Sequence, residues 1–528
     1  MKTRRSIHRT LRMLGAVVVL WTAAGCTGDF AEINRNPNEV TEAEIQRENY
    51  KTGANIKGLI SLVIPVEEHI YQFNELLVGG SYAGYVEGTP DGWLNKFSTF
   101  NPTADWLKWP FVNVLSETYP YYRGIVNGTD NAVMLALADL LRVAIMHRVT
   151  DTYGPIPYSK VIEDRKESLA VAYDSQQEVY TKMFEELDAA IETLQTNVQL
   201  STEAFGKFDN VYGGDISKWL RYARSLKLRM AMRLSYVEPE LAREKAAEAI
   251  AGGVITTNAD NALLTQAENR AALCWTDWND HRIGADILSL MNGYNDPRRE
   301  TMFTQVPVKQ GEQTVMGYAG IRIGAYPASA DQAKAGYSNL IIDSKSPYLW
   351  FNAAEATFLR AEYELRWGSE SEAARLYAEG VALSFEEHGV DGAEAYLAQA
   401  TAVPENYVDN VGSDHIAARS KITLPWATGS QHAEENLERI ITQKYIAIFP
   451  LGTEAWAEYR RTGYPRLFPT VNNQSGGTVS SEHGARRLNY PTEEYTENPA
   501  HVAAAVEMLA GPDTPGTRIW WDVKPYND

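Results

Sequence analysis

The chain has 528 residues, of which 44% are hydrophobic and 22% are charged, so it is long enough to bury one large core or two closely packed ones. Its formal net charge of −19 at pH 7 argues against nucleic acid as a partner, because nucleic-acid recognition normally uses a basic surface. With only two cysteines, the chain cannot be held together by a framework of several internal disulfides.

The first 25 residues have the pattern of an export signal. Five basic residues and no acidic one accompany an apolar run, Leu14 to Trp21, that is too short to span a bilayer as a permanent helix. The run is followed by Ala23-Ala24-Gly25-Cys26, which resembles a bacterial lipobox. We therefore predict cleavage before Cys26, lipid attachment to its thiol, and a mature charge near −24 once the five basic residues are removed. The alternative is an ordinary secretory signal with a chance cysteine.

The segment after Cys26 is predicted to be a tether. Residues 27–38 are polar and rich in turn-forming residues, which favours a lipidated tether over residues 26–45 and a single folded domain over residues 46–528. The first irregular stretch of that domain, residues 85–110, carries Trp93, Trp106 and Trp109 among Gly, Pro, Asn and Asp. Aromatic side chains in such a loop either anchor it to the core or form a binding platform.

Apolar residues at helical spacing predict three helix pairs, at about 132–194, 215–252 and 347–389. In the third pair an apolar face runs from Trp350 to Leu365, Gly368 is predicted to end the helix in a left-handed cap, and Ser369 with Glu372 is predicted to begin the next helix. A pair of this size cannot bury both of its faces, so the pairs are expected to stack as a helical-repeat array. The array is interrupted by three insertions that do not resemble one another, at about 85–110, 256–346 and 390–432.

The insertion at 256–346 contains the best candidates for a ligand site. Trp275 and Trp278 are three residues apart and are followed by Asn279 and Arg282, which can form hydrogen bonds with a polyol. Aromatic rings offer a flat apolar surface to the C–H face of a sugar. The alternative is that the two tryptophans anchor the insertion to the helical body. Trp93 and Tyr82, from the earlier loop region, form a second candidate group.

A set of motifs, taken in order along the chain, resembles the SusD/RagB-like family of outer-membrane nutrient-binding lipoproteins of Bacteroidota. The motifs are Asp151 to Tyr158, Asp215 to Arg233, Asp296-Pro297-Arg298, Asn352 to Glu362, Gln443 to Pro465 and Arg487 to Pro491. The resemblance implies a mostly α fold, with a helical body of tetratricopeptide-like helix pairs and a second irregular region formed by the insertions.

The same resemblance implies a function and a location. Proteins of this family act as a lid on a TonB-dependent (SusC-like) outer-membrane barrel transporter and hold a ligand, most often an oligosaccharide, for import. The chain is then expected at the outer membrane, anchored by its N-terminal lipid and facing the cell exterior. Two alternatives stay open: capture of a peptide or another nutrient in the same role, and a repeat-type scaffold that binds proteins.

The sequence contains none of the common catalytic or phosphate-binding motifs. It has no Gly-x-Ser-x-Gly elbow, no His-Glu-x-x-His pair and no phosphate loop. His147 and His281 are interpreted as local hydrogen-bonding groups, and carboxylate pairs such as Glu185-Glu186 as solvated groups. We therefore expect no catalytic residue, no metal site and no cofactor, with a hydrolase as the remaining alternative.

Overall fold

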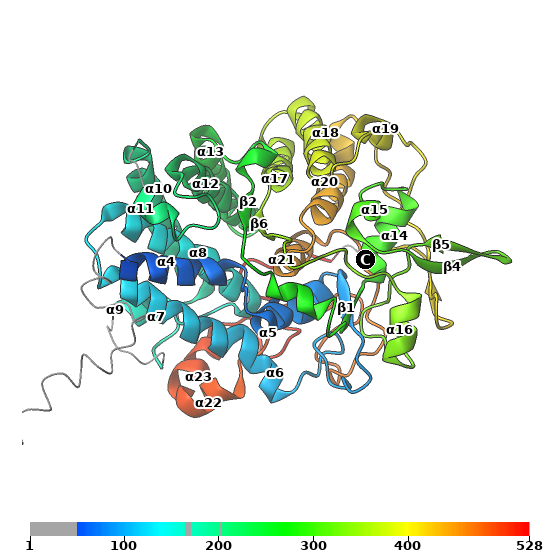
Figure 1. Ribbon diagram of the computed structural model, residues 1–528, viewed down its shortest axis with the longest axis horizontal. Helices are drawn as coiled ribbons and strands as arrows, with labels where there is room; N and C mark the ends of the chain where they lie inside the picture. The colour runs from blue at the N-terminus through cyan, green and yellow to red at the C-terminus, as the bar shows by residue number, and fades with distance from the viewer. Residues whose placement is uncertain (1–49, 164–169, 200–202, 527–528) are drawn as a thin grey trace, which may run out of the picture. The chain divides into compact units, whose positions relative to one another are not determined.

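The computed structural model describes residues 50–163, 170–199 and 203–526. The predicted signal peptide, the lipid-attachment residue Cys26 and the predicted tether over residues 26–45 lie outside the described residues. From Thr52 onward the described residues form one compact unit, and that unit is mostly helical, as the sequence predicted (Figure 1). Within the described part of the chain, no helix has both the length and the apolar character needed to cross a membrane.

The helices of the body pack as pairs that stack on one another (Figure 1). The three predicted pairs are present as α8 with α10, α12 with α13, and α17 with α18; α12 also contacts α10 and α17, so the pairs form a continuous array. Two more helices complete the body: α20 packs against α17 and α18, and α21 packs against α8, α20 and the π-helix η2 (Gln72–Gly80). The bounds are α4 Tyr50–Val63, α7 Val114–Val126, α8 Ala132–Tyr153, α10 Gln176–Thr196, α12 Ile216–Arg233, α13 Pro239–Gly252, α17 Ala353–Trp367, α18 Glu370–Glu387, α20 Ala433–Ala447 and α21 Gly452–Thr462.

Most of these helices begin where a side chain can bind the free backbone N–H groups of the first turn. Asn131, Asp215, Asn352 and Ser369 cap α8, α12, α17 and α18 in this way. Ser175 and Glu178 form a complete capping box on α10. The local sequence therefore fixes where the helices start, before any packing is considered.

The structure corrects two expectations about the third pair. Trp350 lies in a short strand, and the helix begins only at Ala353. Gly368 has φ −123° and is not left-handed. A Cβ atom at this position would lie 1.9 Å from Oε2 of Glu364, so a larger residue would displace the carboxylate that accepts a hydrogen bond from the Ser369 N–H group.

Two other expectations are also corrected. The sequence pattern predicts that the second helix of the first pair begins at Asp174, whereas α10 begins at Gln176 and Asp174 pairs with Ile156 in an isolated antiparallel bridge. Glu186 is not a solvated carboxylate, since it forms an ion pair of 2.6 Å with the buried Arg142. Both differences come from long-range contacts that helical spacing does not report.

The remaining elements are short and lie mainly in the predicted insertions. Four two-stranded antiparallel sheets, β1 with β3, β2 with β6, β4 with β5 and β7 with β8, connect them within the described residues. The helices are α5 Glu68–Tyr71, η2 Gln72–Gly80, α6 Ala104–Lys108, η3 Trp109–Asn113, α9 Ser159–Glu163, α11 Glu203–Gly206, η4 Asn258–Asp260, η5 Arg270–Cys274, α14 Ala285–Gly293, α15 Arg299–Met302, α16 Ala330–Gly336, α19 Ala393–Leu397, η6 Ser430–His432, α22 Thr492–Glu497 and α23 Pro499–Glu507. The strands are β1 Val86–Gly88, β2 Ala262–Leu264, β3 His281–Ile283, β4 Val306–Gln310, β5 Gln313–Gly317, β6 Tyr348–Phe351, β7 Tyr407–Val408 and β8 His415–Ile416.

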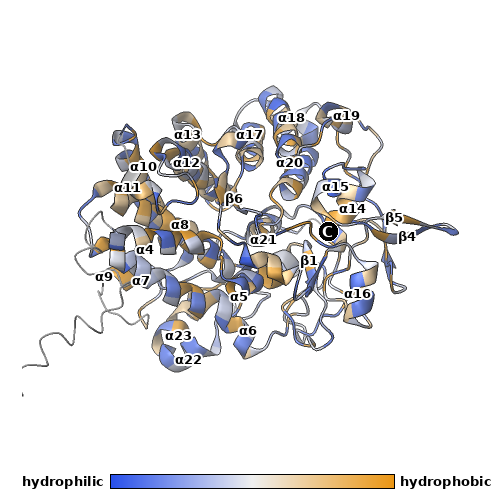
Figure 2. Cartoon of the chain, in the orientation of Figure 1, coloured by the Kyte–Doolittle hydropathy of each residue, from blue (hydrophilic) through white to orange (hydrophobic). Residues whose placement is uncertain are grey.

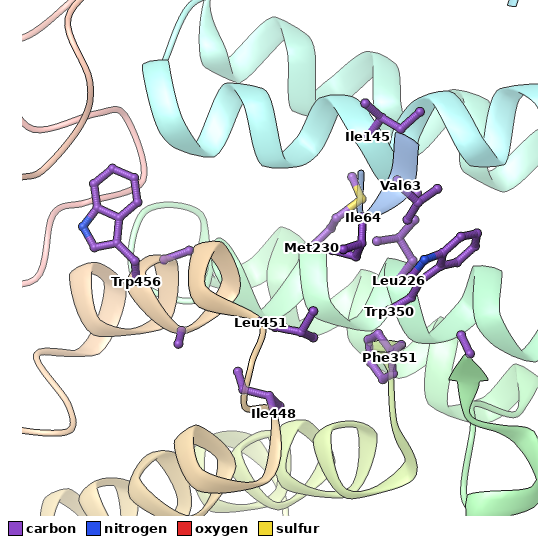
Figure 3. Packing of buried hydrophobic residues seen from close by; sticks show 14 of the residues in the cluster. Val63, Ile64, Ile145, Leu226, Met230, Trp350, Phe351, Ile448, Leu451 and Trp456 are labelled. Carbon is purple, nitrogen blue, oxygen red and sulfur yellow. The ribbon is translucent and has the colours of Figure 1, made fainter. Parts of the chain in front are cut away.

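One continuous hydrophobic core joins the helical body to the insertions. Figure 3 shows part of it, where Leu226 and Met230 of α12 lie close to Trp350 and to Val63. Most helices carry both hydrophobic and hydrophilic residues along their length, as expected when one side is buried (Figure 2). The helical patterns around Trp219, Trp350, Trp456, Trp520 and Trp521 predict that these tryptophans are core or packing residues. The structure agrees: four are at most 1% exposed, and Trp520 is partly buried and packs against the core.

A network of buried charges crosses this core between the helices. Arg233 of α12 contacts Asp151 of α8 at 3.2 Å and Glu454 of α21 at 2.6 Å, and it also pairs with Glu458. Arg461 of α21 makes two hydrogen bonds of 2.6 Å with Glu362 of α17. Ten side chains form the network: the cations Arg229, Arg233, Arg366, Lys444 and Arg461, and the anions Asp151, Glu355, Glu362, Glu454 and Glu458. Positive and negative groups are therefore equal in number.

The network keeps its carboxylates ionised inside the protein. Burial by itself raises the pKa of Glu454, but Arg233, Arg229 and Lys444 lower it to about 2. Burial likewise opposes ionisation of Glu362, and Arg461 lowers its pKa below the ordinary value. A charge left without its partner here would have no water to solvate it, so each member depends on the others.

Close backbone contact holds η2 against α21. A Cβ atom at Gly79 would lie 2.2 Å from the Thr453 backbone nitrogen, and one at Gly452 would lie 2.3 Å from the Glu75 carbonyl oxygen. Glu75 in turn accepts a hydrogen bond of 2.6 Å from the Thr453 hydroxyl group. Glycine at both positions lets the first part of the domain dock directly on the helix that carries Glu454.

The first prediction concerns the buried network. Replacing Glu362→Gln removes an anion that binds both Arg461 and Arg366, so we expect the free energy of unfolding to fall by about 3 kcal/mol. Chemical denaturation of the chain from Thr27 onward measures the effect. Glu372→Gln, which affects only an exposed ion pair with Arg375, is the matched control and should change stability by less than about 1 kcal/mol. Equal effects of the two substitutions would contradict the assigned role of the network.

The second prediction concerns pH. Burial raises the pKa of Asp286 from its ordinary value of 3.8 to about 7, although the Phe468 N–H group donates to it at 2.6 Å. The Asp286 carboxyl group therefore binds its proton more tightly in the native state than in the unfolded state. The stability that this protonation contributes is present below about pH 4 and is lost as pH rises to about 7. In wild-type denaturation curves the free energy of unfolding should fall by about 3 kcal/mol between pH 4.5 and 8, and Asp286→Asn should remove that fall. Asp277→Asn, at an exposed position, should keep the wild-type profile.

Candidate functional site

Pairing of β1 with β3 brings together the two segments that the sequence singled out. Glu87 lies opposite Arg282 and Gly88 opposite His281 in an antiparallel register. Beyond the pair, the Thr89 N–H group donates to the Asp280 carbonyl oxygen at 2.8 Å. The loop that carries Trp93 is thereby placed beside the turn that carries Trp278, although 185 positions separate the two residues in the sequence.

A row of aromatic rings extends between these two tryptophans. Trp93 meets Trp106 edge to face at 5.2 Å between centroids, and Phe73 lies beneath, edge to face with Trp106 at 5.3 Å and stacked on Trp109 at 5.3 Å. His69 continues the row, 5.9 Å from Trp109 and 4.9 Å from Trp278. We call the five partly or fully exposed rings the aromatic surface: His69, Trp93, Trp106, Trp109 and Trp278.

Exposed polar groups lie beside these rings in the sequence. Glu67 precedes α5, Asp105 is next to Trp106, and Asp277 is next to Trp278; all three are exposed. Carboxylate oxygens of this kind accept hydrogen bonds from hydroxyl groups. The aromatic surface therefore combines flat apolar faces with acceptors at its margins, which is the combination that a sugar ring requires.

A buried ion pair supports the loop that carries Trp93. Lys96 donates to Glu87 at 2.6 Å and to the Ala325 carbonyl oxygen at 3.0 Å. Glu87 also accepts hydrogen bonds from the Ser98 hydroxyl group and from the Gly324 N–H group. Both charged side chains are almost fully buried, so their contacts anchor the loop to the core. On the other side of the loop Leu94 is exposed and Trp93 is partly exposed.

Three of the predicted ligand residues point into the protein. Trp275 has no exposed surface and packs beside His281 at 5.6 Å between ring centroids. Arg282 is 2% exposed and donates to the backbone carbonyl oxygens of His281 and Ala333. Asn279 is half-buried with φ 58°, and its carbonyl oxygen accepts from Arg282. These residues shape the turn that holds Trp278, and Trp275 packs as the anchor of the insertion.

Tyr82 also lies away from the aromatic surface. Its ring packs between Phe100 and Trp456, and its buried hydroxyl group faces a cavity of about 20 Å³ that Asp286 also lines. A carboxyl group with a raised pKa is a typical candidate for acid catalysis. This cavity, however, has room for about one water molecule and none for a sugar ring, so Asp286 cannot reach a glycosidic bond.

The structure brings one possible metal-binding group together within the described residues. Glu67, Glu68 and His69 place their ligand atoms within 4.8 Å of one another. Two of these groups already have structural roles, since Glu67 caps α5 and Glu68 binds Arg270 through both oxygens. The cluster is explained by the fold, and we assign no ligand to it.

The sequence leaves open whether Trp106 and Trp109 anchor the loop or form a binding platform, and it predicts irregular backbone around them. In the structure Thr103 caps a short helix over Ala104–Lys108 that continues directly into η3. The spacing of three between the two tryptophans was the available signal for that helix. His69 had no such signal, because it lies on a four-residue helix whose position depends on the contacts around it.

Comparisons with known proteins agree with this architecture. The family model described as Susd and RagB outer membrane lipoprotein matches residues 32–522. A SusD homologue of known structure from Bacteroides thetaiotaomicron is 51% identical, with a TM-score of 0.85 over 90% of this chain and 100% of that one. One from Bacteroides ovatus is 39% identical, with a TM-score of 0.84 over 90% and 99%.

A third solved structure is a chitin-binding SusD homologue from Flavobacterium johnsoniae. It is 36% identical, with a TM-score of 0.81 over 90% of this chain and 100% of that one. No curated protein sequence matches the chain. The family match spans nearly the whole chain and agrees with the solved structures, so the chain belongs to the SusD-like family, the Susd and RagB outer membrane lipoproteins.

Proposed function

We propose that this chain is a nutrient-binding lipoprotein of the cell surface that captures an oligosaccharide on the aromatic surface. The observation that carries the proposal is the row of rings from Trp93 to Trp278, in which four tryptophans that pack against the core each keep part of their surface exposed. Partly exposed aromatic rings gathered in one row form an apolar patch of the kind that marks a binding site. Membership of the SusD-like family supports the same role, and one solved relative is a chitin-binding protein.

The expected affinity suits capture beside a transporter. Burying about 60 Å² of a sugar against one ring is worth roughly 1.5 kcal/mol. Two or three rings together with a few hydrogen bonds then give binding in the micromolar to millimolar range. Such a ligand is concentrated at the surface and still released within the time of a transport cycle.

We further propose that the protein delivers its ligand to a TonB-dependent, SusC-like barrel in the outer membrane, as a lid that is anchored by lipid on Cys26. The family description as an outer membrane lipoprotein supports this location. The proposal includes no catalytic step. Glu454 and Glu458, whose pKa values neighbouring cations hold below the ordinary value despite burial, belong to the buried ion network, where a substrate cannot reach them.

The third prediction tests the aromatic surface. Trp278→Ala and Trp109→Ala should each weaken binding of a neutral oligosaccharide such as chitotriose about tenfold, because each removes one ring worth roughly 1.5 kcal/mol. Calorimetric titration of the purified chain measures the loss. Trp367→Ala is the control, since this tryptophan is also half-buried but lies at the end of α17.

Unchanged binding in both aromatic-surface variants would place the site elsewhere. If the chain bound peptides but no sugar, the captured nutrient would be a peptide, or the protein would be a scaffold that binds other proteins. Circular dichroism of each variant shows whether a loss of binding is a loss of fold.

The fourth prediction concerns the anchor. Cys26→Ser should release the protein from the membrane fraction and remove the lipid mass from its N-terminal peptide, because only the thiol at this position can be lipidated after cleavage. Cys274→Ser is the matched control, since Cys274 is buried and should leave the protein in the membrane fraction. Retention of the Cys26→Ser variant in the membrane fraction would refute the lipobox interpretation.

A further inference from the structure

A cavity of about 550 Å³ lies where the end of α21 meets the C-terminal segment of the described chain. Its volume falls in the range that holds small organic ligands. The charged side chains that line it are Arg419, Arg460, Arg466, Arg486, Lys524 and Glu482. We call it the basic cavity, because five cations and one carboxylate line it in a chain whose net charge is −19.

Some of these charges are already neutralised. Arg486 holds Asp522 through two hydrogen bonds of 2.7 and 2.5 Å, and Lys524 pairs with Glu434. Arg419 and Arg466 are held less tightly. Arg419 is 41% exposed and pairs with an exposed Glu482, while Arg466 is 38% exposed and lies 3.8 Å from Glu438. Arg419 can turn toward a ligand at little cost, because exposed ion pairs are weak. Arg466 is separated from the buried Glu438 by a distance too long for a hydrogen bond, so its guanidinium group keeps donors for a ligand.

Arg460 adds a positive charge that no ion pair cancels among the described residues. It is 1% exposed, and its hydrogen bonds go to the backbone carbonyl oxygens of Asp151, Trp456 and Arg486. Its Nη2 atom has no partner. Burial lowers the pKa of Arg460 to about 9, so the group is still charged at neutral pH. Its field acts on the basic cavity through a medium of low dielectric constant, where screening by water is weak.

Aromatic side chains form another part of the lining. Tyr526 stacks on His483 with 3.5 Å between centroids and 4° between the ring planes, and it is 41% exposed. Tyr464 and Tyr459 also line the cavity. Arg518 also lies over the Tyr526 ring, 4.1 Å from its centroid, so the two faces of this ring are covered and its edge is left for a ligand. The basic cavity therefore offers ring edges beside guanidinium groups, which suits a ring-shaped ligand that carries an anion.

From these contacts we infer that the basic cavity binds a glycan that carries an acidic group, either a carboxylate or a sulfate, with Arg419 and Arg466 on the anion and the edge of Tyr526 beside the sugar. A guanidinium group donates two parallel hydrogen bonds to a carboxylate or sulfate, which a neutral hydroxyl group cannot match. None of the residues that line the basic cavity belongs to the aromatic surface, so the inference goes beyond the proposed function by adding a second site, for an acidic glycan.

The fifth prediction tests this inference by calorimetric titration of the full mature chain with three trisaccharides. They are tri-galacturonate, its neutral methyl ester and a sulfated galactose trisaccharide. At least one acidic probe should bind ten times more tightly than the ester or better, and the tighter of the two identifies the anion. Higher salt should weaken binding of the acidic probes alone, because it screens the guanidinium groups.

Variants locate the site. The double variant Arg419→Gln/Arg466→Gln should lose tenfold or more in affinity for the acidic probe, whereas Arg375→Gln/Arg243→Gln, at exposed positions of α18 and α13, has the same change of charge and should bind normally. Tyr526→Ala provides a second variant that leaves both arginines in place, and it should also weaken binding. Thermal unfolding reports whether each variant is folded.

Two results would overturn the inference: equal affinity for the acidic probes and the ester, or normal binding of the acidic probe by the folded double variant. The proposed function would survive either result if a neutral oligosaccharide still bound and Trp278→Ala weakened its binding. Absence of binding to every saccharide would remove both proposals together.

Discussion

The buried ion network is the constraint on which the arrangement of helices depends. Its members come from five helices, α8, α12, α17, α20 and α21, most of which are far apart in the sequence. Arg233 binds carboxylates of α8 and α21, and Arg461 binds carboxylates of α17 and α21. Buried ion pairs are weak sources of net stability, but they penalise strongly any packing that separates the partners. The network therefore acts mainly by making alternative packings of the helices costly, while the hydrophobic core around Trp350 and Trp456 supplies most of the favourable free energy.

The packed helical body explains how irregular segments can hold the aromatic rings at fixed positions. The aromatic surface is built on short helices and a loop, which have few hydrogen bonds of their own. They are held because η2 lies against α21 at Gly79 and Gly452, and because β1 pairs with β3 directly beside Trp93 and Trp278. A surface that must present several rings at fixed spacing needs such support, since a flexible loop would lose entropy on binding.

The aromatic surface and the basic cavity differ in the chemistry that they offer. The first has rings with carboxylates nearby, and suits the neutral face of a sugar. The second concentrates guanidinium groups, including the buried Arg460, in a protein that is strongly acidic overall. A negative surface repels anionic ligands at long range, so a site that binds them must create its own local positive potential. The clustering of arginines at the end of α21 supplies that potential.

The sequence by itself determined the local features of this protein. Helical spacing and capping residues such as Asp215 and Ser369 located the helix pairs, because these signals act over a few residues. Motif order also identified the family and with it the mostly helical fold. The sequence indicated correctly that Trp219 and Trp456 are core residues, since they lie in or beside helical patterns. Only the tertiary structure decided which of Trp275 and Trp278 faces outward. It also placed Trp93 near Trp278 through the pairing of β1 with β3, and it brought arginines from three segments together in one cavity. Those outcomes depend on contacts between residues far apart in the chain, and neither spacing nor composition encodes such contacts.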